Sequence, residues 1–407
     1  MSDLERELLE LKERVSESIT PSPGMAGRVF HRARIRRVVT GMTGVLVAGA
    51  LGLASIAGVR TFVAPTSEGP VGPQPNIESP TPSDLNPRVT AAIPVGAEPR
   101  TVVVGEGAVW VAVLDRDDGM ENYSVVRIDP ESNEVAARIP LEIGVDRLAV
   151  GFGAVWAGGY SEQDGAAIAR IDPQNNEVVA TIGGVTDPEV GIDMSGGASV
   201  WAIAPGESPP DSHTLARIDP ETNEIVSTIP VGPITDIAVG EGAVWVLKAH
   251  IEGDVVGAKD VVKVDPATNR VVGTATLDAH YIRLLAGAGA VWAPGWLHDF
   301  ADVGTGQGDR PVVVRIDPES AEISQEPISL HTTFRPFGVG EGGVWIISGP
   351  EKPSGLCRLN QLTHQVDECV EPGDLAEVFF DPAVLDSASH TLWVANERET
   401  VTRVDLR

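Results

Sequence analysis

A tryptophan recurs along most of the chain at a nearly constant interval, and this repeat limits the possible folds more than any other feature. It occupies Trp110, Trp156, Trp201, Trp245, Trp292, Trp345 and Trp393. The intervals are 46, 45, 44, 47, 53 and 48 residues. Each tryptophan stands in a phrase such as GEGAVWV, and a second phrase such as LARIDPETNEI follows it. Repeats of this length indicate supersecondary units that stack or close into a ring.

Each repeat has the pattern of four short strands. The segment ITDIAVG predicts an inner strand, Gly-Glu-Gly a tight turn and AVWVL the second strand. In the repeat before it, TLARIDP predicts a third strand, and a turn at Pro220–Asn223 leads into EIVSTIP as the fourth. Apolar residues alternate along these last two, as half-buried strands require. Seven such units predict an all-β fold, a seven-bladed β-propeller over residues 88–407.

The two ends of the repeat region predict how the ring closes. The last repeat ends at VTRVDLR, a third strand with no fourth after it, and RVTAAIPVG precedes the first repeat as an isolated fourth strand. We therefore expect Arg88–Val95 to complete blade seven beside Thr400–Arg407. This pairing would remove two exposed sheet edges.

The repeat also resembles known propeller families. The phrase RIDPETNEIVSTIPVG resembles the YVTN-type propeller repeat, and GEGAVWVA resembles the repeats of virginiamycin B lyase-like propellers. The resemblance covers Arg88–Arg407 and implies the fold, whereas such propellers host lyases, binding proteins and sensors. The lyase-like enzymes place a catalytic histidine and acids on one propeller face, and no residue here matches that motif one by one.

The residues before the repeats predict a membrane anchor. Residues 1–37 hold an amphipathic helix, with Leu4, Leu8, Leu11 and Val15 on one stripe, and end in a basic juxtamembrane segment. Residues 38–59 are uncharged and apolar, long enough for a single transmembrane helix. Arginines gather before this segment, so the positive-inside rule predicts a single-pass cell-membrane protein with a cytoplasmic N-terminus and an extracytoplasmic propeller. A cleaved signal peptide is the alternative. Residues 60–87 predict a Pro-rich linker.

The charge is strongly divided between these regions. Residues 1–37 carry eight basic and six acidic residues, net +2, and the rest of the chain carries 22 basic and 52 acidic residues, net −30. An acidic body repels phosphate backbones, so we expect no nucleic-acid partner. The acidity favours solubility or, alternatively, attraction of a cationic ligand or metal.

Residues repeated in every blade are expected to be structural. The tryptophans predict packing between blades. An Arg or Lys stands two residues before the Asp or Asn of each third strand, as in Arg217 and Asp219, and predicts an ion pair or a turn clamp. Asp219 can accept hydrogen bonds from the amides of its turn, and Asn223 tolerates a left-handed conformation.

The two cysteines, Cys357 and Cys369, fall on the predicted third and fourth strands of blade six. They are expected to face each other as a disulfide, which suits an oxidising compartment, with two buried free thiols as the alternative.

Binding residues are expected on one face. The turns joining strands one to two and three to four repeat the same phrases, whereas the loops on the opposite face vary, for example LDRDDGMENY after Trp110. Variable loops on a rigid scaffold often carry binding groups. The candidates, all in blades four to six, are His250, His280, Tyr281, Arg283, Trp296, His298, Asp299, His331 and Arg335. They could equally be ordinary polar loop residues.

The sequence favours a membrane-anchored extracytoplasmic module that binds an unknown protein or small molecule. A streptogramin-lyase-like lyase or hydrolase is one alternative, and a sensor that signals through the N-terminal helix is another. The sequence predicts no cofactor, although His and acid groups on the candidate face could hold a divalent metal.

Overall fold

The computed structural model describes residues 88–406 except for the segments 118–119, 162–164, 194–198, 207–212, 253–254, 278–279, 282, 298–309, 325, 331–333, 341–342, 349–354, 361–364, 367–382 and 397–398. The chain divides into two compact units, Met1–Thr81 and Pro82–Arg407. Only the second contains described residues, and none of its described segments is a helix that could cross a bilayer. The predicted amphipathic helix, transmembrane segment and linker lie outside the described residues, so the anchor stays a prediction.

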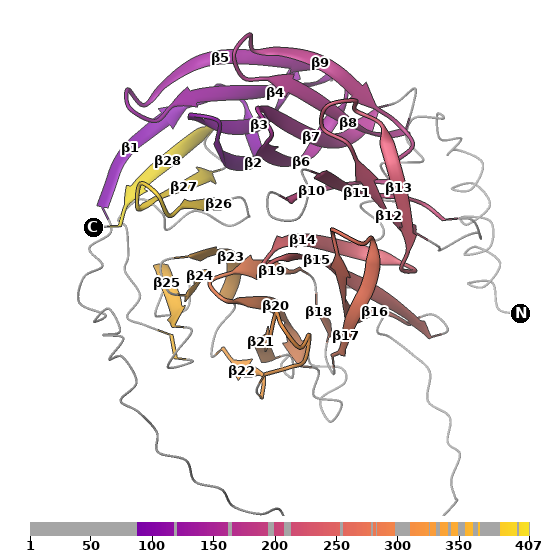
Figure 1. The fold of residues 1–407 in the computed structure, drawn as a ribbon. Coiled ribbons are helices and arrows are strands. Elements are labelled where there is room, and N and C mark those ends of the chain that lie inside the picture. The colour runs from indigo at the N-terminus through magenta and orange to yellow at the C-terminus, as the bar shows by residue number, and fades with distance from the viewer. Residues whose placement is uncertain are drawn as a thin grey trace, which may run out of the picture. The chain divides into compact units, whose positions relative to one another are not determined.

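The described residues form seven antiparallel sheets, one for each repeated tryptophan (Figure 1). Blade one contains β2 (Glu98–Gly105), β3 (Ala108–Asp117), β4 (Met120–Asp129) and β5 (Glu134–Leu141). Blade two contains β6 (Gly144–Gly151), β7 (Ala154–Ser161), β8 (Gly165–Asp172) and β9 (Glu177–Ile182). Blade three contains β10 (Asp187–Asp193), β11 (Ser199–Pro205), β12 (His213–Ile218) and β13 (Ile225–Pro230). Blade four contains β14 (Ile234–Gly240), β15 (Ala243–Glu252), β16 (Val255–Asp265) and β17 (Arg270–Thr276).

The last three blades are less regular. Blade five has its inner strand in two pieces, β18 (His280–Tyr281) and β19 (Leu285–Gly287), followed by β20 (Ala290–Leu297), β21 (Arg310–Ile316) and a short β22 (Ile328–Ser329). Blade six contains β23 (Phe334–Gly340), β24 (Gly343–Ser348) and β25 (Gly355–Asn360), and most of its predicted fourth strand lies outside the described residues. Blade seven contains β26 (Ala383–Asp386), β27 (Thr391–Asn396), β28 (Thr400–Asp405) and β1 (Arg88–Pro94).

The ring closes as the two ends of the repeat region predicted. Strand β1 pairs antiparallel with β28, from Arg88 opposite Asp405 to Pro94 opposite Thr400 (Figure 1, where indigo meets yellow). The innermost strands contact one another in the order β2, β6, β10, β14, β19, β23, β26 and back to β2. The structure therefore confirms a seven-bladed β-propeller.

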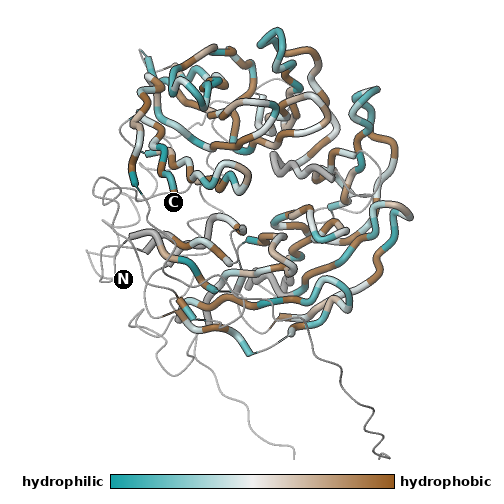
Figure 2. Tube along the Cα trace, turned by 60° about the vertical axis from the view of Figure 1, so that its left-hand side comes forward, coloured by the Kyte–Doolittle hydropathy of each residue, from teal (hydrophilic) through white to brown (hydrophobic). Residues whose placement is uncertain are grey.

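The repeated tryptophans fill the spaces between blades. All seven are at most 1% exposed. Trp110 of blade one packs in one apolar cluster with Leu148 and Val155 of blade two, as expected for a packing role. Its Nε1 donates to the Gly105 carbonyl oxygen five residues earlier, and the tryptophans of blades two, four, five and six repeat this bond. In the hydropathy view, brown stretches lie mainly along the strands and teal stretches gather at the turns (Figure 2).

Candidate functional site

The two ends of the propeller differ in how their polar side chains are used. We call the end with the turns between strands one and two and between strands three and four the turn face. The end with the loops between strands two and three and between blades is the loop face. Because adjacent strands are antiparallel, all connections of each kind lie at the same end.

On the turn face, an aspartate at the end of each regular third strand caps its own turn. Asp219 Oδ1 accepts hydrogen bonds from the backbone nitrogens of Glu221 and Thr222, at 2.8 and 3.0 Å. These backbone hydrogen bonds, that of Thr222 first, lower the pKa of Asp219 below its usual value. Asn223 then adopts the left-handed conformation with φ of 61°. Both features confirm the predicted turn chemistry.

Other blades repeat this cap. The pKa is also lowered at Asp129, mainly by the amides of Ser132 and Glu131. At Asp265 the first cause is the Thr268 hydroxyl, and at Asp317 it is the Ser320 amide. The equivalent asparagines of blades one, two and four are left-handed as well, at Asn133, Asn176 and Asn269.

The repeated basic residue links neighbouring blades. The guanidinium of Arg127 lies over the Trp110 ring, 5.4 Å from its centroid. Its Nη1 donates to the Pro173 carbonyl oxygen at 2.8 Å and to Asn176 Oδ1 at 3.2 Å, both in the turn of blade two. We call this arrangement the cross-blade latch. It fits the predicted turn clamp, and Arg403 also forms the predicted ion pair with the aspartate two positions on, Asp405, at 3.0 Å.

The latch recurs around most of the ring. Arg170, Arg217 and Lys263 reach the turns of blades three, four and five. Arg403 of blade seven reaches Pro130 and Asn133 of blade one, across the closing seam. Arg315 is different, because it donates to Ser324 and Gly289 of its own blade. The polar groups of the turn face are thus engaged in holding turns and blades together.

On the loop face, two hairpins extend beyond their sheets. In blade one, the outer strands stop early: β2 pairs no further than Leu114 and β5 no further than Tyr123. The two middle strands, β3 and β4, continue to pair beyond that point. Their last pairs run from Asp115 opposite Asn122 to Asp117 opposite Met120. We call residues 115–117 and 120–122 the blade-one ribbon. In blade four, residues 250–252 and 255–257 form an equivalent blade-four ribbon.

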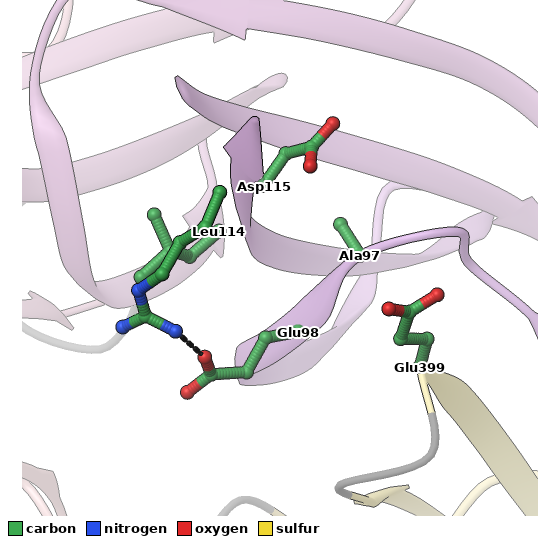
Figure 3. Close-up of a pocket in the computed structure, with 6 residues that line it drawn as sticks. Ala97, Glu98, Leu114, Asp115 and Glu399 are labelled. Atoms are coloured by element: carbon green, nitrogen blue, oxygen red, sulfur yellow. Dashed lines mark hydrogen bonds and ion pairs between the residues drawn. The ribbon is translucent and has the colours of Figure 1, made fainter. Parts of the chain in front are cut away.

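A cavity of about 410 Å³ lies at the base of the blade-one ribbon, at the seam between blades seven and one. Its lining residues are Ala97, Glu98, Leu114, Asp115, Arg116 and Glu399. Figure 3 shows Asp115 and Glu399 projecting from separate segments on either side of Ala97. Ring closure brings these segments together, since Val95, directly after β1, donates its backbone N–H to the Glu399 carbonyl oxygen at 2.8 Å.

The charges in this cavity are only partly compensated. Glu98 forms an ion pair with Arg116 and a second with Arg100 at 3.0 Å. Burial opposes ionisation of Glu98, but the hydrogen bonds from Arg116 and then Arg100 outweigh it and lower the pKa of the carboxyl. The hydrogen bond that Arg116 donates to Glu98 raises the pKa of Arg116 in turn. Asp115 and Glu399 have no partner among the described residues, so they give the cavity a net negative charge.

The structure places some of the predicted binding residues on described strands. His280 and Trp296 lie directly opposite each other on β18 and β20. His250 lies in the blade-four ribbon opposite Gly257, and Arg335 lies on β23 opposite Ile347.

Two more of these residues have described side chains. The Tyr281 side chain is 2% exposed in the apolar cluster between blades four and five, so it packs in the core there. Arg283 is half-buried beside Leu284. Leu284 donates its N–H to the buried Asp236 Oδ2 at 2.6 Å, a bond that joins blades four and five.

The remaining predictions lie outside the described residues. His298, Asp299 and His331 are in undescribed segments, and so is Cys369. Cys357 is buried on β25 opposite Ile346, and its disulfide with Cys369 stays a prediction. No described His, Cys, Asp and Glu side chains gather in a group that could hold a metal ion, and a divalent metal stays untested for the other segments.

The cavity at the closing seam was not predicted. Three of its residues, Leu114, Asp115 and Arg116, stand in the loop LDRDDGMENY, which sequence variation had placed on the loop face. Glu399 and Glu98 are 301 positions apart in the chain. The predicted pairing of β1 with β28 is the signal that could have brought them together.

Comparisons with known proteins support the fold alone. No protein-family model matches the chain, and no curated protein matches it in sequence. The WD40 domain of Neurospora crassa Pan2 aligns with a TM-score of 0.56 at 8% identity, covering 79% of this chain and 95% of that one. Kuenenia stuttgartiensis hydrazine synthase aligns with a TM-score of 0.53 at 12% identity, covering 75% of this chain and 94% of that one. The WD40 domain of Toxoplasma gondii coronin gives 0.51 at 10% identity, with 79% and 86% covered. The chain is therefore similar to WD40-type propellers in architecture.

Proposed function

We propose that this protein is a membrane-anchored, extracytoplasmic propeller that binds a protein partner on its loop face. The observation that carries the proposal is the difference between the two faces. Turn-face aspartates and arginines bond to their own turns and to neighbouring blades, whereas the loop face has a cavity, two ribbons that extend beyond their sheets and the carboxylates of Asp115 and Glu399. Propellers of the WD40 type commonly act as protein-interaction modules, which favours a protein over a small molecule.

The topology of blade seven supports the use of the loop face. Arg88 begins β1 opposite Asp405, the last residue of β28, so the chain enters the propeller at the turn face. A Pro-rich linker over 60–87 would span up to roughly 87 Å at about 3.1 Å per residue. Entry at the turn face keeps the start of β1 at the end of the propeller opposite the loop face.

The alternative functions gain no comparable support. A streptogramin-lyase-like reaction would depend on residues such as His298 and Asp299, which lie outside the described segments. A sensor would signal through the helix predicted in residues 1–37, which also lies outside them.

Site-specific photocrosslinking in intact membranes tests the proposed face. A benzoylphenylalanine at Asp117 or Glu252, in the two ribbons, should give adducts with a partner protein. The same probe at Glu131 or Glu221, in exposed turns of the opposite face, serves as the matched control and should give none. Adducts from the turn face with none from the ribbons would overturn the proposal.

The membrane topology needs its own experiment. A Glu131→Cys variant should react with a membrane-impermeant maleimide on intact cells, and a Ser16→Cys variant should react only after lysis. The unsubstituted protein gives the background from Cys357 and Cys369. Labelling of the Ser16→Cys variant in intact cells, with protection of the Glu131→Cys variant, would reverse the proposed orientation.

A further inference from the structure

The blade-one ribbon ends in the most exposed large apolar side chain among the described residues. Met120, opposite Asp117 at the tip, is 66% exposed. Exposed valines such as Val226, at 54%, lie on outer strands within their sheets, whereas Met120 stands beyond the sheet. Burying a methionine side chain in an interface is favourable, and its flexible thioether adapts to varied partners. The position is therefore suited to contact with another molecule.

One face of the ribbon is acidic and has no basic side chain. Directly opposite residues of an antiparallel pair lie on the same face, and this face alternates with the other along each strand. Asp115, Asp117, Met120 and Asn122 thus share one face. Arg116 and Glu121 share the other, where Arg116 pairs with Glu98 and lies 3.7 Å from Glu121.

The acidic face continues into the cavity. Asp115 belongs both to the ribbon face and to the cavity lining, and Glu399 lies on the blade-seven side. Figure 3 shows both carboxylates in the same pocket, while Glu98 is held by its dashed ion pair. Neither the Asp115 nor the Glu399 carboxylate has a partner among the described residues. An apolar tip, an acidic face and a negative cavity therefore follow one another from the edge of the ribbon to its base.

We propose that the blade-one ribbon and its cavity form the docking surface for a basic segment of the partner protein. A lysine or arginine side chain enters the cavity between Asp115 and Glu399, and an apolar residue of the same segment covers Met120. Charge complementarity selects a basic peptide segment as the occupant. The carboxylates are spread along the ribbon and the cavity, which suits several positive charges along one segment better than a single small cation. The proposal rests on the proposed binding function of the loop face and assigns its partner a chemistry.

Binding of labelled peptides to the full-length protein in zwitterionic nanodiscs tests this surface. The probe is an alternating lysine–leucine hexapeptide, with hexalysine and hexaglutamate for comparison, followed by fluorescence anisotropy. Hexaglutamate should not bind. A D115N/D117N/E399Q variant should bind the alternating peptide about tenfold more weakly than the parent protein. Its melting temperature should stay unchanged, because these are exposed positions, and the D117N single variant at the tip provides a second check.

A matched variant separates this surface from the net charge. E131Q/E177Q/E221Q removes the same charge from exposed turn-face residues and should change the affinity by less than about twofold. M120S should weaken the alternating peptide by about threefold and leave hexalysine unaffected. Equal losses from both triple variants, or no loss from either, would overturn the inference. Crosslinks from the blade-four ribbon alone would overturn it too while leaving the proposed function intact.

Discussion

On the turn face, Asp219 accepts hydrogen bonds from two amides of its own turn and Arg217 reaches across to Pro266 of the next blade. On the loop face, Asp115 and Glu399 are carboxylates with no such partner among the described residues. The same residue types therefore stabilise the ring at one end and stay available to solvent at the other. The repeated Asp219 and Arg217 are bonded within the fold, whereas the carboxylates of Asp115 and Glu399, which lie outside the repeat, are available for binding.

The largest expected effect comes from β1, which runs from the turn face to the cavity. Deleting residues 88–94 from the full chain removes the pairing of β1 with β28. It also removes the buried Ile93 side chain, which is 3% exposed. Losing one buried isoleucine side chain costs about 2–5 kcal/mol, so losing the strand should cost more than about 5 kcal/mol. Calorimetry should show a large fall in melting temperature and loss of peptide binding at the cavity.

Deletion of seven linker residues, 75–81, is the control for a shortened chain. It should leave the melting temperature of the propeller unchanged, since these residues precede β1. If the two deletions behave alike, β1 does not close the ring in the folded protein.

The cross-blade latch should give a smaller but distinct loss. Arg127→Ala removes the contact with Trp110 and the hydrogen bonds to Pro173 and Asn176. Cation–π contacts and charged hydrogen bonds together predict a loss of about 2 kcal/mol in the free energy of unfolding, measured with urea. Arg127→Lys should retain part of the stabilisation, because Lys263 donates to the Pro318 carbonyl oxygen in the same way, at 2.6 Å.

Arg315 provides the matched control for the latch. It lies over Trp292 but donates within its own blade, so Arg315→Ala should cost less than Arg127→Ala. A larger loss from Arg315→Ala would show that the cross-blade bonds contribute little and that the turn face is not specialised for holding the ring.

The turn caps should make the stability depend on pH. Hydrogen bonds lower the folded-state pKa of Asp129, Asp219, Asp265 and Asp317 below the unfolded value of about 3.9. A depressed folded pKa adds stability above the unfolded pKa, and this stability is lost as the pH falls through the folded values.

Replacing these four aspartates with asparagine keeps an acceptor oxygen in each turn but removes the titration. The urea midpoint of the parent protein should fall between about pH 5 and pH 3, and that of the fourfold variant should fall less. Parallel curves would show that the caps do not contribute to acid sensitivity.

Much of the fold could be predicted because the sequence contains seven copies of one unit. The Trp110 phrase, the Asp219 cap and the left-handed Asn223 each repeat, so both the local turn structure and the order of the blades could be predicted from the sequence. The latch was less predictable, because Arg127 and Asn176 meet only when two blades pack and i, i+2 spacing suggests the nearer aspartate. The cavity was least predictable, since Glu98 and Glu399 meet only through ring closure and neither belongs to the repeat.

The smallest predicted effect concerns a turn where the repeat fails. Ala321 stands where blades one to four have asparagine, yet it keeps the left-handed conformation, with φ of 58°. This conformation costs a residue other than glycine or asparagine roughly 1–2 kcal/mol. Lys263 of blade four reaches the same turn through the carbonyl oxygens of Pro318 and Glu319, without the side-chain amide that Arg127 finds in Asn176.

Ala321→Asn should relieve the backbone and give Lys263 a further acceptor, but Ala321 is only 2% exposed, so the cost of the larger side chain should keep the net gain in the free energy of unfolding below about 1 kcal/mol. Ala321→Gly relieves the backbone alone, so the difference between the two variants in urea unfolding isolates the amide. A second comparison in a Lys263→Ala background should reduce that difference to near zero, because the amide then has no donor to accept from. If the difference persists without Lys263, the asparagines of the turn face act within their own turns, and the latch depends on the carbonyl oxygens alone.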